Sequence, residues 1–220
     1  MLLAKDDATR MKYFDPYERS ILEPVAMIKE NGKEVPTSRK DAETRRTELL
    51  KYLQDPLVEL CTENVEALLF SIPGARVLKE VYAVSLSEKL AKAVADASSE
   101  AIKLYKGNPE DAEQKLAQLF NDSVGHRSVK NLILHDATSD NPVFTNALLE
   151  LPDEALCDLA ATNRGAFVLA SIFKVESLDE KSVKKLRTPS FKKSVKAMKK
   201  KSEVKAGYDA LLKEIDVRVQ

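Results

Sequence analysis

The chain of 220 residues contains little of what enzymes, metalloproteins and disulfide-bonded proteins are built from. It has no Trp, two His and two Cys, and Gly and Pro number only 6 and 9. Neither His126 nor His135 belongs to a zinc spacing such as H-E-x-x-H, and no glycine-rich phosphate loop or G-x-S-x-G elbow occurs. These absences argue against catalysis, so we expect a protein that is not an enzyme and uses no metal or cofactor.

Long apolar runs are also missing. No stretch of about 18 apolar residues occurs, so the sequence predicts no membrane-spanning helix. Residues 1–7 lack the regions of a signal peptide and are typical of the middle of a helical repeat, which suggests a fragment of a longer protein. In such a chain the isolated Cys61 and Cys157 are expected to be reduced core residues.

The residues that are abundant favour helices. Charged residues make up 32% of the chain, above the roughly 25% of an average domain, and no alternating Val/Ile/Thr-rich run is long enough for a sheet. Pro and acidic residues that follow capping residues mark helix starts, with capping boxes at residues 38–41 and 177–180. We expect helices over 17–30, 41–54, 56–70, 75–84, 86–105, 110–122, 126–135, 142–150, 153–162, 166–175, 178–187, 190–200 and 203–217, and a loop over 29–37.

Three segments repeat one pattern, each beginning at a glycine: Gly74, Gly125 and Gly165. At about 100° per residue, positions three, four, seven and eight after each glycine share one side of a helix, and only Ser128 among them is not apolar. Positions one, two and five, here called the display positions, form a separate arc. Such a repeat is typical of a helical solenoid. The glycines are 51 and 40 residues apart, which predicts a longer helix or an extra loop in the middle, and a weaker fourth copy is predicted at Gly207.

The display positions carry most of the functional signal. They hold Arg76 with Lys79, then His126 with Arg127 and Lys130, then Phe167 between two alanines. Arginine and lysine at this spacing hold a phosphate or stack on a base. One such pair is more often an ordinary solvated pair, and it is the recurrence in register that favours a binding role. Phe167 fits base stacking, core packing and contact with a neighbouring helix equally well.

Charge is distributed unevenly, although the net charge is zero. Residues 181–205 contain eleven Lys or Arg and one acid, Glu203, so this segment carries +10 and the remainder −10. Nucleic acid, an anionic membrane and an acidic protein surface all fit such a segment, and a merely solvated helix is the commonest explanation of a basic run. Too few large apolar residues are present for membrane insertion. The candidate binding residues here are Lys184, Lys185, Lys192, Lys193, Lys196, Lys199 and Lys200.

Two further segments carry a family resemblance. Residues 38–50, SRKDAETRRTELL, and residues 163–169, NRGAFVL, together with the glycine-led helices, resemble the CPL region of the Puf-A/penguin branch of the PUF (pumilio-like) repeat family. The likeness extends over about residues 2–215. It implies an all-α fold, a right-handed α-solenoid of PUF/armadillo-like helical repeats. Residues 37–220 would form the repeat region with basic C-terminal helices, and residues 1–36 a helical lead-in and loop that end a preceding repeat.

The resemblance also implies a function. Members of that branch bind RNA, and also DNA, with little sequence preference, and they act in large-subunit ribosome biogenesis or translational regulation in the nucleolus and nucleus. The family's base-reading positions correspond here to Arg76, Lys79, His126, Arg127, Lys130 and Phe167, with Arg164 in the same late motif. None of these sets matches the Asn/Ser–aromatic–Gln or Ser–aromatic–Glu combinations by which other PUF proteins choose bases. The expected partners are RNA and pre-ribosomal particles or assembly factors, with no membrane and no small-molecule substrate.

A second function class fits the same sequence. Helical repeats also serve as protein-docking scaffolds of the armadillo or HEAT kind, and fold alone does not choose between the two uses. In that reading the acidic remainder and the basic segment would hold assembly factors directly. A pull-down with and without nuclease separates the alternatives, because protein contacts survive the removal of RNA.

Overall fold

The computed structural model describes residues 15–18, 27–37, 40–107 and 113–217. It forms two compact units, Met1–Leu57 and Val58–Gln220. The lead-in boundary expected after residue 36 stays a prediction, and so does the repeat-like character of residues 1–7, which lie outside the described residues.

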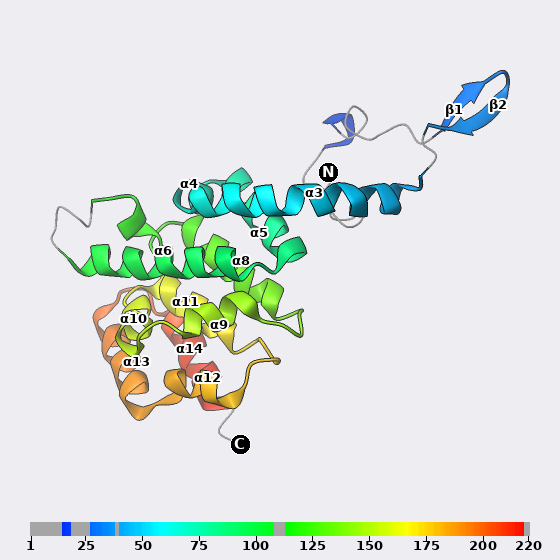
Figure 1. The fold of residues 1–220 in the computed structure, drawn as a ribbon. Helices are drawn as coiled ribbons and strands as arrows, with labels where there is room; N and C mark the ends of the chain where they lie inside the picture. The colour runs from blue at the N-terminus through cyan, green and yellow to red at the C-terminus, as the bar shows by residue number, and fades with distance from the viewer. Residues whose placement is uncertain (1–14, 19–26, 38–39, 108–112, 218–220) are drawn as a thin grey trace. The chain divides into compact units, whose positions relative to one another are not determined.

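The first unit contains a β-hairpin where we expected a helix and a loop. Strand β1, Met27–Glu30, pairs antiparallel with β2, Lys33–Pro36 (Figure 1). The turn between them places Asn31 at φ 51° and Gly32 at φ 78°. Asn-Gly is the favoured pair for a two-residue hairpin turn because both residues tolerate positive φ. The helix expected over 17–30 is therefore wrong for its last four residues, and this hairpin is the exception to an all-α chain.

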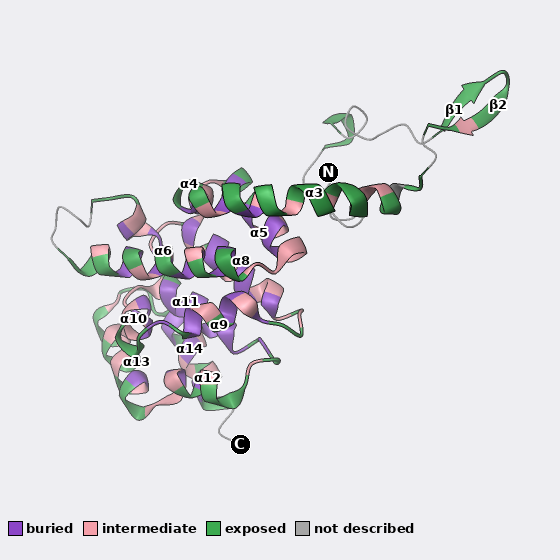
Figure 2. Ribbon diagram, in the orientation of Figure 1, coloured by how far each residue is buried: buried purple, intermediate pink, exposed green. Residues whose placement is uncertain are grey.

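Helix α3, Ala42–Glu63, replaces two expected helices. Asp41 caps it by accepting a hydrogen bond from the Thr44 amide at 2.9 Å. We expected a break at Pro56, but the helix continues through it. The apolar stripe stays in register on both sides of the proline, at Leu50, Leu57 and Cys61, so the helical period is the same before and after it. α3 is mostly exposed along its length (Figure 2).

The second unit is helical wherever it has regular structure among the described residues. Its elements are α4 (Val65–Leu69), α5 (Ile72–Ser85), α6 (Glu88–Lys106), η1 (Leu116–Gln118), α8 (Gly125–Asp136), α9 (Val143–Leu149), α10 (Asp153–Leu159), α11 (Asn163–Ile172), α12 (Glu180–Lys184), η2 (Lys185–Arg187), α13 (Pro189–Lys201) and α14 (Ala206–Val217). Most agree with the expected segments.

Three expectations in this unit need correction or detail. Of the helix expected over 110–122, the described residues contain only the short 3-10 helix η1. The cap of α12 is Asp179, which accepts from the Ser182 amide at 2.8 Å, and not Ser177. The long middle repeat is explained by α6, whose 19 residues precede α8, whereas two helices of 7 residues each, α9 and α10, precede α11.

The helices of the second unit form two rows. In the inner row, each glycine-led helix packs on the next, in the order α5, α8, α11 and α14 (Figure 1). In the outer row, α6 packs on α9 and α10, and α10 packs on α13. Contacts of α8 with α9, α10 with α11 and α13 with α14 join the rows. This arrangement is the predicted helical-repeat solenoid, with Gly207 beginning the fourth copy.

The predicted buried side of the repeat is confirmed at nearly every position. Leu78, Val129, Leu169 and Leu211, all four residues after their glycine, are fully buried. Ser128, the polar exception, is buried too, and its hydroxyl donates to the Leu69 carbonyl at 2.9 Å. The prediction is wrong for Val77, which is 40% exposed. The first copy is therefore less completely covered than the others.

Both cysteines are free thiols: Cys61 is buried in the core and Cys157 is half-buried. Burial raises the pKa of each, and for Cys157 the carboxylates of Asp158 and Asp153 add to the effect. Within the described segments, no helix is both long enough and apolar enough to cross a membrane. Those segments also contain no cluster of three His, Cys, Asp or Glu arranged to hold a metal ion.

Candidate nucleic-acid interface

The inner-row helices share a start signal that we did not use in the sequence analysis. The Gly74 amide donates to the Ser71 hydroxyl at 3.0 Å, the Gly125 amide to the Asp122 carboxylate at 2.7 Å and the Gly165 amide to the Thr162 hydroxyl at 2.9 Å. An oxygen-bearing side chain three residues before each glycine satisfies one of the free amides of the helix N-terminus. The S/D/T-x-x-G spacing is visible in the sequence.

Hydrogen bonds between successive copies fix how the inner-row helices are rotated. The Thr162 hydroxyl donates to the Phe120 carbonyl at 2.9 Å, and the Tyr208 hydroxyl donates to the Ala161 carbonyl at 3.1 Å. Gly207, which has no such residue three positions before it, donates its amide to the Asn163 side chain at 2.7 Å. Each contact joins the start of one inner-row helix to the preceding copy, so the display positions keep a common orientation.

Display residues of α8 and α11 come together in space. The Lys130 ammonium lies 5.7 Å from the centre of the Phe167 ring, a cation–π distance. Both residues are half-buried. This contact decides between the three roles considered for Phe167 to one extent: the ring packs beside the neighbouring inner-row helix and remains partly accessible. We call His126, Arg127, Lys130, Arg164 and Phe167 the α8–α11 cluster.

Electrostatics confirm that the cluster is compact around His126. Burial, followed by the positive charges of Arg164, Arg127 and Lys130, lowers the pKa of His126. A hydrogen bond from Nδ1 to the Asp122 carbonyl at 2.7 Å acts in the opposite direction. Because a carbonyl oxygen only accepts, Nδ1 carries the proton in the neutral ring. The Nε2 atom is then an acceptor among three cations.

Asp122 joins the cap to the cluster. Partial burial acts to raise the pKa of its carboxyl, but the amides of Gly125 and Val124 and the charge of Arg164 together hold the pKa below its ordinary value. The carboxylate is thus anionic at neutral pH and occupied by amides. It orients the N-terminus of α8, at which His126 and Arg127 are the first exposed positions.

The other display positions differ from copy to copy. On α5, Arg76 is exposed and Lys79 half-buried, with the Lys79 ammonium 3.5 Å from the Glu80 carboxylate, which offsets part of its charge. On α11, Ala166 and Ala170 are buried, because their small side chains let α14 approach. The expectation that all three positions of the third copy face outward is therefore wrong, and only Phe167 does so.

The predicted lysines of the basic segment separate into three groups. Lys185 donates to the carbonyls of Leu149 and Leu151 at 3.1 and 3.4 Å and caps the end of α9. Lys192 and Lys199 form ion pairs with Asp216 and Asp209 of α14. The rest, Lys184, Lys193, Lys196 and Lys200, are exposed. Since α13 belongs to the outer row, these lysines and the α8–α11 cluster lie on different rows of helices.

One further cation–aromatic contact was not predicted. The Lys115 ammonium lies 5.0 Å from the centre of the Phe70 ring. The two residues are 45 positions apart and in different elements, so no local spacing in the sequence signals the contact. Lys115 is exposed and Phe70 half-buried.

Comparison with known proteins agrees with the repeat. The family model of the CPL (NUC119) domain matches residues 8–143, more than half of the chain. The chain belongs to the CPL (NUC119) family. Among solved structures, the crystal structure of human Puf-A is similar, with a TM-score of 0.67 at 22% identity, and the match covers 97% of this chain. No curated protein matches.

The likeness to Puf-A at this identity shows the fold, a helical-repeat solenoid. The resemblance predicted from residues 38–50 and 163–169 is confirmed by the family match and by this structure. The matched region is 38% of the Puf-A chain, so the activity and partners of a whole protein of this kind do not follow from the match.

Proposed function

We propose that this chain binds RNA through charge and shape, with little sequence preference and without catalysis. The observation that carries the proposal is the α8–α11 cluster, in which Arg127, Lys130 and Arg164 surround one partly exposed aromatic ring and one histidine. Three cations within electrostatic reach of His126 form a strong anion-attracting site. An adjacent aromatic face is what an unstacked base requires.

Each member of the cluster has a distinct role in this proposal. Arg127 and Arg164 would hold phosphate oxygens, since a guanidinium offers paired donors to them. The Lys130 ammonium would leave the Phe167 ring for a phosphate, which frees the ring face for a base. His126 Nε2 would accept a hydrogen bond from a base amino group or a 2′-hydroxyl. Phosphate contacts position a nucleic acid without reading its sequence.

The proposal extends to both ends of the solenoid. Arg76 and Lys79 on the adjacent α5 would continue the phosphate track of the inner row, and the exposed Lys184, Lys193, Lys196 and Lys200 would add a second basic surface on the outer row. Lys185, Lys192 and Lys199 have intramolecular partners and would contribute less. DNA presents the same phosphates and would bind as a weaker alternative ligand.

Membership of the CPL family supports a biological setting for this binding. We propose a role in large-subunit ribosome biogenesis or translational regulation, in the nucleolus and nucleus, with pre-ribosomal particles or assembly factors as partners. Localisation of a tagged chain, and its co-sedimentation with pre-ribosomal particles before and after nuclease treatment, test this setting.

The RNA-binding proposal is tested by removing the charge of the cluster. In a filter-binding titration with single-stranded RNA, the variant Arg127→Gln/Lys130→Gln/Arg164→Gln should lose at least tenfold in affinity at 150 mM salt, because three phosphate contacts are removed. The matched control Lys89→Gln/Lys103→Gln/Lys174→Gln removes three exposed cations elsewhere and should lose little. Equal losses would show that net charge alone matters, and unchanged affinity of the folded cluster variant would refute the assignment.

A further inference from the structure

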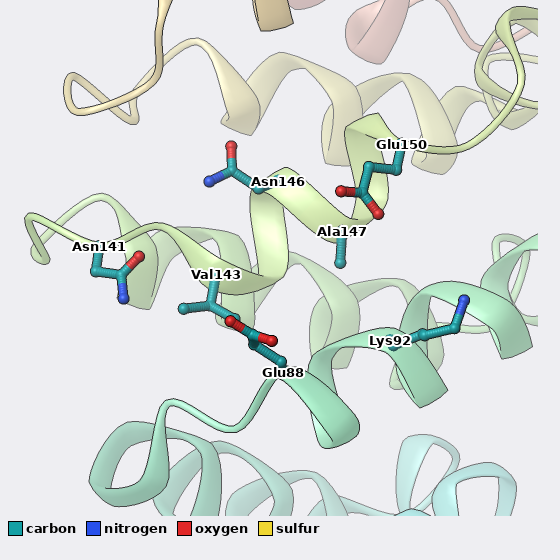
Figure 3. Close-up of a pocket in the computed structure, with 7 residues that line it drawn as sticks. All are labelled: Glu88, Lys92, Asn141, Val143, Asn146, Ala147 and Glu150. Atoms are coloured by element: carbon teal, nitrogen blue, oxygen red, sulfur yellow. The ribbon is translucent and has the colours of Figure 1, made fainter.

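The outer row contains a cleft that the proposed function does not use. It has a volume of about 360 Å³ and lies between α6 and α9 (Figure 3). Glu88 and Lys92 line it from α6, and Asn141, Val143, Asn146, Ala147 and Glu150 line it from α9 and the residue pair before that helix. Since α6 and α9 belong to the outer row, the cleft is separate from the α8–α11 cluster.

The α9 side of the cleft is one continuous face. Val143, Asn146, Ala147 and Glu150 follow the i, i+3, i+4, i+7 spacing that places residues along one side of a helix. Val143 and Ala147 are half-buried and provide a small apolar floor, while Asn146 and Glu150 are exposed beside it. With a rise of about 1.5 Å per residue, this face is about 10 Å long, which is the length of about three residues of extended chain.

The charges of the cleft favour a cationic ligand. The carboxylates of Glu88 and Glu150 form no ion pair with any described residue, whereas the only ammonium in the lining, that of Lys92, lies 3.6 Å from the Asp96 carboxylate. Glu150 is also the C-terminal cap residue of α9, where the helix dipole disfavours a negative charge. The nearby Lys185 directs its ammonium to main-chain carbonyls and Asp153.

The amides define the rest of the ligand. Asn141 and Asn146 are exposed at the cleft, and each amide offers both donors and an acceptor. This combination matches the alternating N–H and C=O groups of an extended peptide, and it is not needed to bind a simple cation. We propose that the α6–α9 cleft binds a short extended segment of a partner protein that carries lysine or arginine, with its backbone on the two asparagines and its cationic side chains on Glu88 and Glu150.

The probe for this site is a fluorescein-labelled peptide, Gly-Ser-Lys-Ala-Arg-Ser-Gly, titrated with the nuclease-treated full chain in a fluorescence anisotropy assay. The variant Glu88→Gln/Glu150→Gln should weaken binding about five- to tenfold, as expected for the loss of two exposed ion pairs. The variant Ala147→Leu keeps the charge but fills the floor and should weaken binding as well. The control Glu154→Gln/Glu176→Gln removes two exposed carboxylates outside the cleft and should bind like the parent chain.

Several results would overturn the peptide site. These are failure of the peptide to bind, equal losses in the control and the cleft variants, full affinity in Glu88→Gln/Glu150→Gln, or displacement of the peptide by spermidine at equal concentration, which would show charge alone to be recognised. RNA binding provides an independent readout. The cleft variants should keep the RNA affinity of the parent chain, so this site and the RNA proposal succeed or fail separately.

Discussion

At the residue scale, Gly165 shows how little space the repeat leaves at the start of an inner-row helix. A Cβ atom built on Gly165 would lie 1.8 Å from the Leu159 carbonyl oxygen, and one on Gly207 would lie 2.0 Å from the Asn163 carbonyl oxygen. Main-chain carbonyls of packed helices do not move aside as a flexible side chain would. The glycines are therefore required by close approach between copies.

Gly165→Ala should accordingly lose about 2–4 kcal/mol of unfolding free energy, in the range of substitutions that overpack a core. Urea denaturation followed by circular dichroism measures the loss. Ala97→Gly on α6 provides a scale, because it should cost about 1 kcal/mol through helix propensity alone. An unchanged denaturation midpoint for Gly165→Ala would contradict the close-packed geometry.

His126 gives a prediction about pH. Its pKa in the free protein is below the ordinary 6.5, so the folded chain binds fewer protons than the unfolded chain, and stability should fall as pH decreases below 6.5. RNA phosphates favour the protonated ring, and RNA affinity should rise over the same range. His126→Gln should remove this pH-dependent increment in a binding titration from pH 7.5 to 5.5. A parent-like rise in the variant would exclude His126 from the interface.

At the element scale, one buried hydrogen-bond network joins three helices. The Tyr82 hydroxyl of α5 donates to Asp136 of α8 at 2.6 Å and accepts from the Phe144 amide of α9 at 2.7 Å. The second Asp136 oxygen accepts from the amide and hydroxyl of Thr145, both at 2.7 Å. Burial, together with the adjacent Asp136, raises the pKa of Tyr82, so its hydroxyl stays protonated and remains a donor.

Tyr82→Phe leaves a buried carboxylate oxygen and a buried amide without their partner, and it should lower the unfolding free energy by about 2–3 kcal/mol. Tyr52→Phe removes the same hydroxyl from a side chain that is 77% exposed and should change nothing measurable. Equal effects of the two substitutions in urea denaturation would mean that the network adds no stability.

Helix α13 has two faces that should behave differently towards RNA. Lys192 and Lys199 are engaged by acids of α14, while Lys193 and Lys196 are exposed without an ion-pair partner among the described residues. Lys193→Gln/Lys196→Gln should lower the slope of log affinity against log salt by about 2, one for each phosphate contact. Lys192→Gln/Lys199→Gln removes the same charge from the same helix and should lower it by less. The reverse order would refute the assignment of α13 to RNA.

At the scale of the whole molecule, the repeat could be predicted from the sequence because it depends on local periodicity. The glycine-led helices, their buried sides and the fourth copy at Gly207 follow from spacing alone. The hairpin was missed although Asn31-Gly32 is its signal, because its strands are too short to show alternation. The continuity of α3 through Pro56 was missed because a proline after an aspartate looks the same at a helix start.

The candidate site could be predicted only in part. Arg127, Lys130 and Phe167 stand out by their register after the glycines, but the approach of Lys130 to Phe167 depends on the rotation between α8 and α11. That rotation is set by contacts such as Thr162 to Phe120, which join residues 42 positions apart. The pairing of Lys192 and Lys199 with α14 is equally non-local, so net charge along the sequence overstated the free charge of this segment.

The salt dependence of RNA binding tests the central claim most directly. The parent chain is titrated with two unlabelled single-stranded RNAs of equal length and unrelated sequence at 50, 100 and 200 mM salt. Binding through phosphates predicts affinities for the two RNAs within about threefold of each other and a linear fall of log affinity with log salt, with a slope near −0.7 for each phosphate contacted. A preference of 100-fold or more for one sequence, with little dependence on salt, would contradict this account.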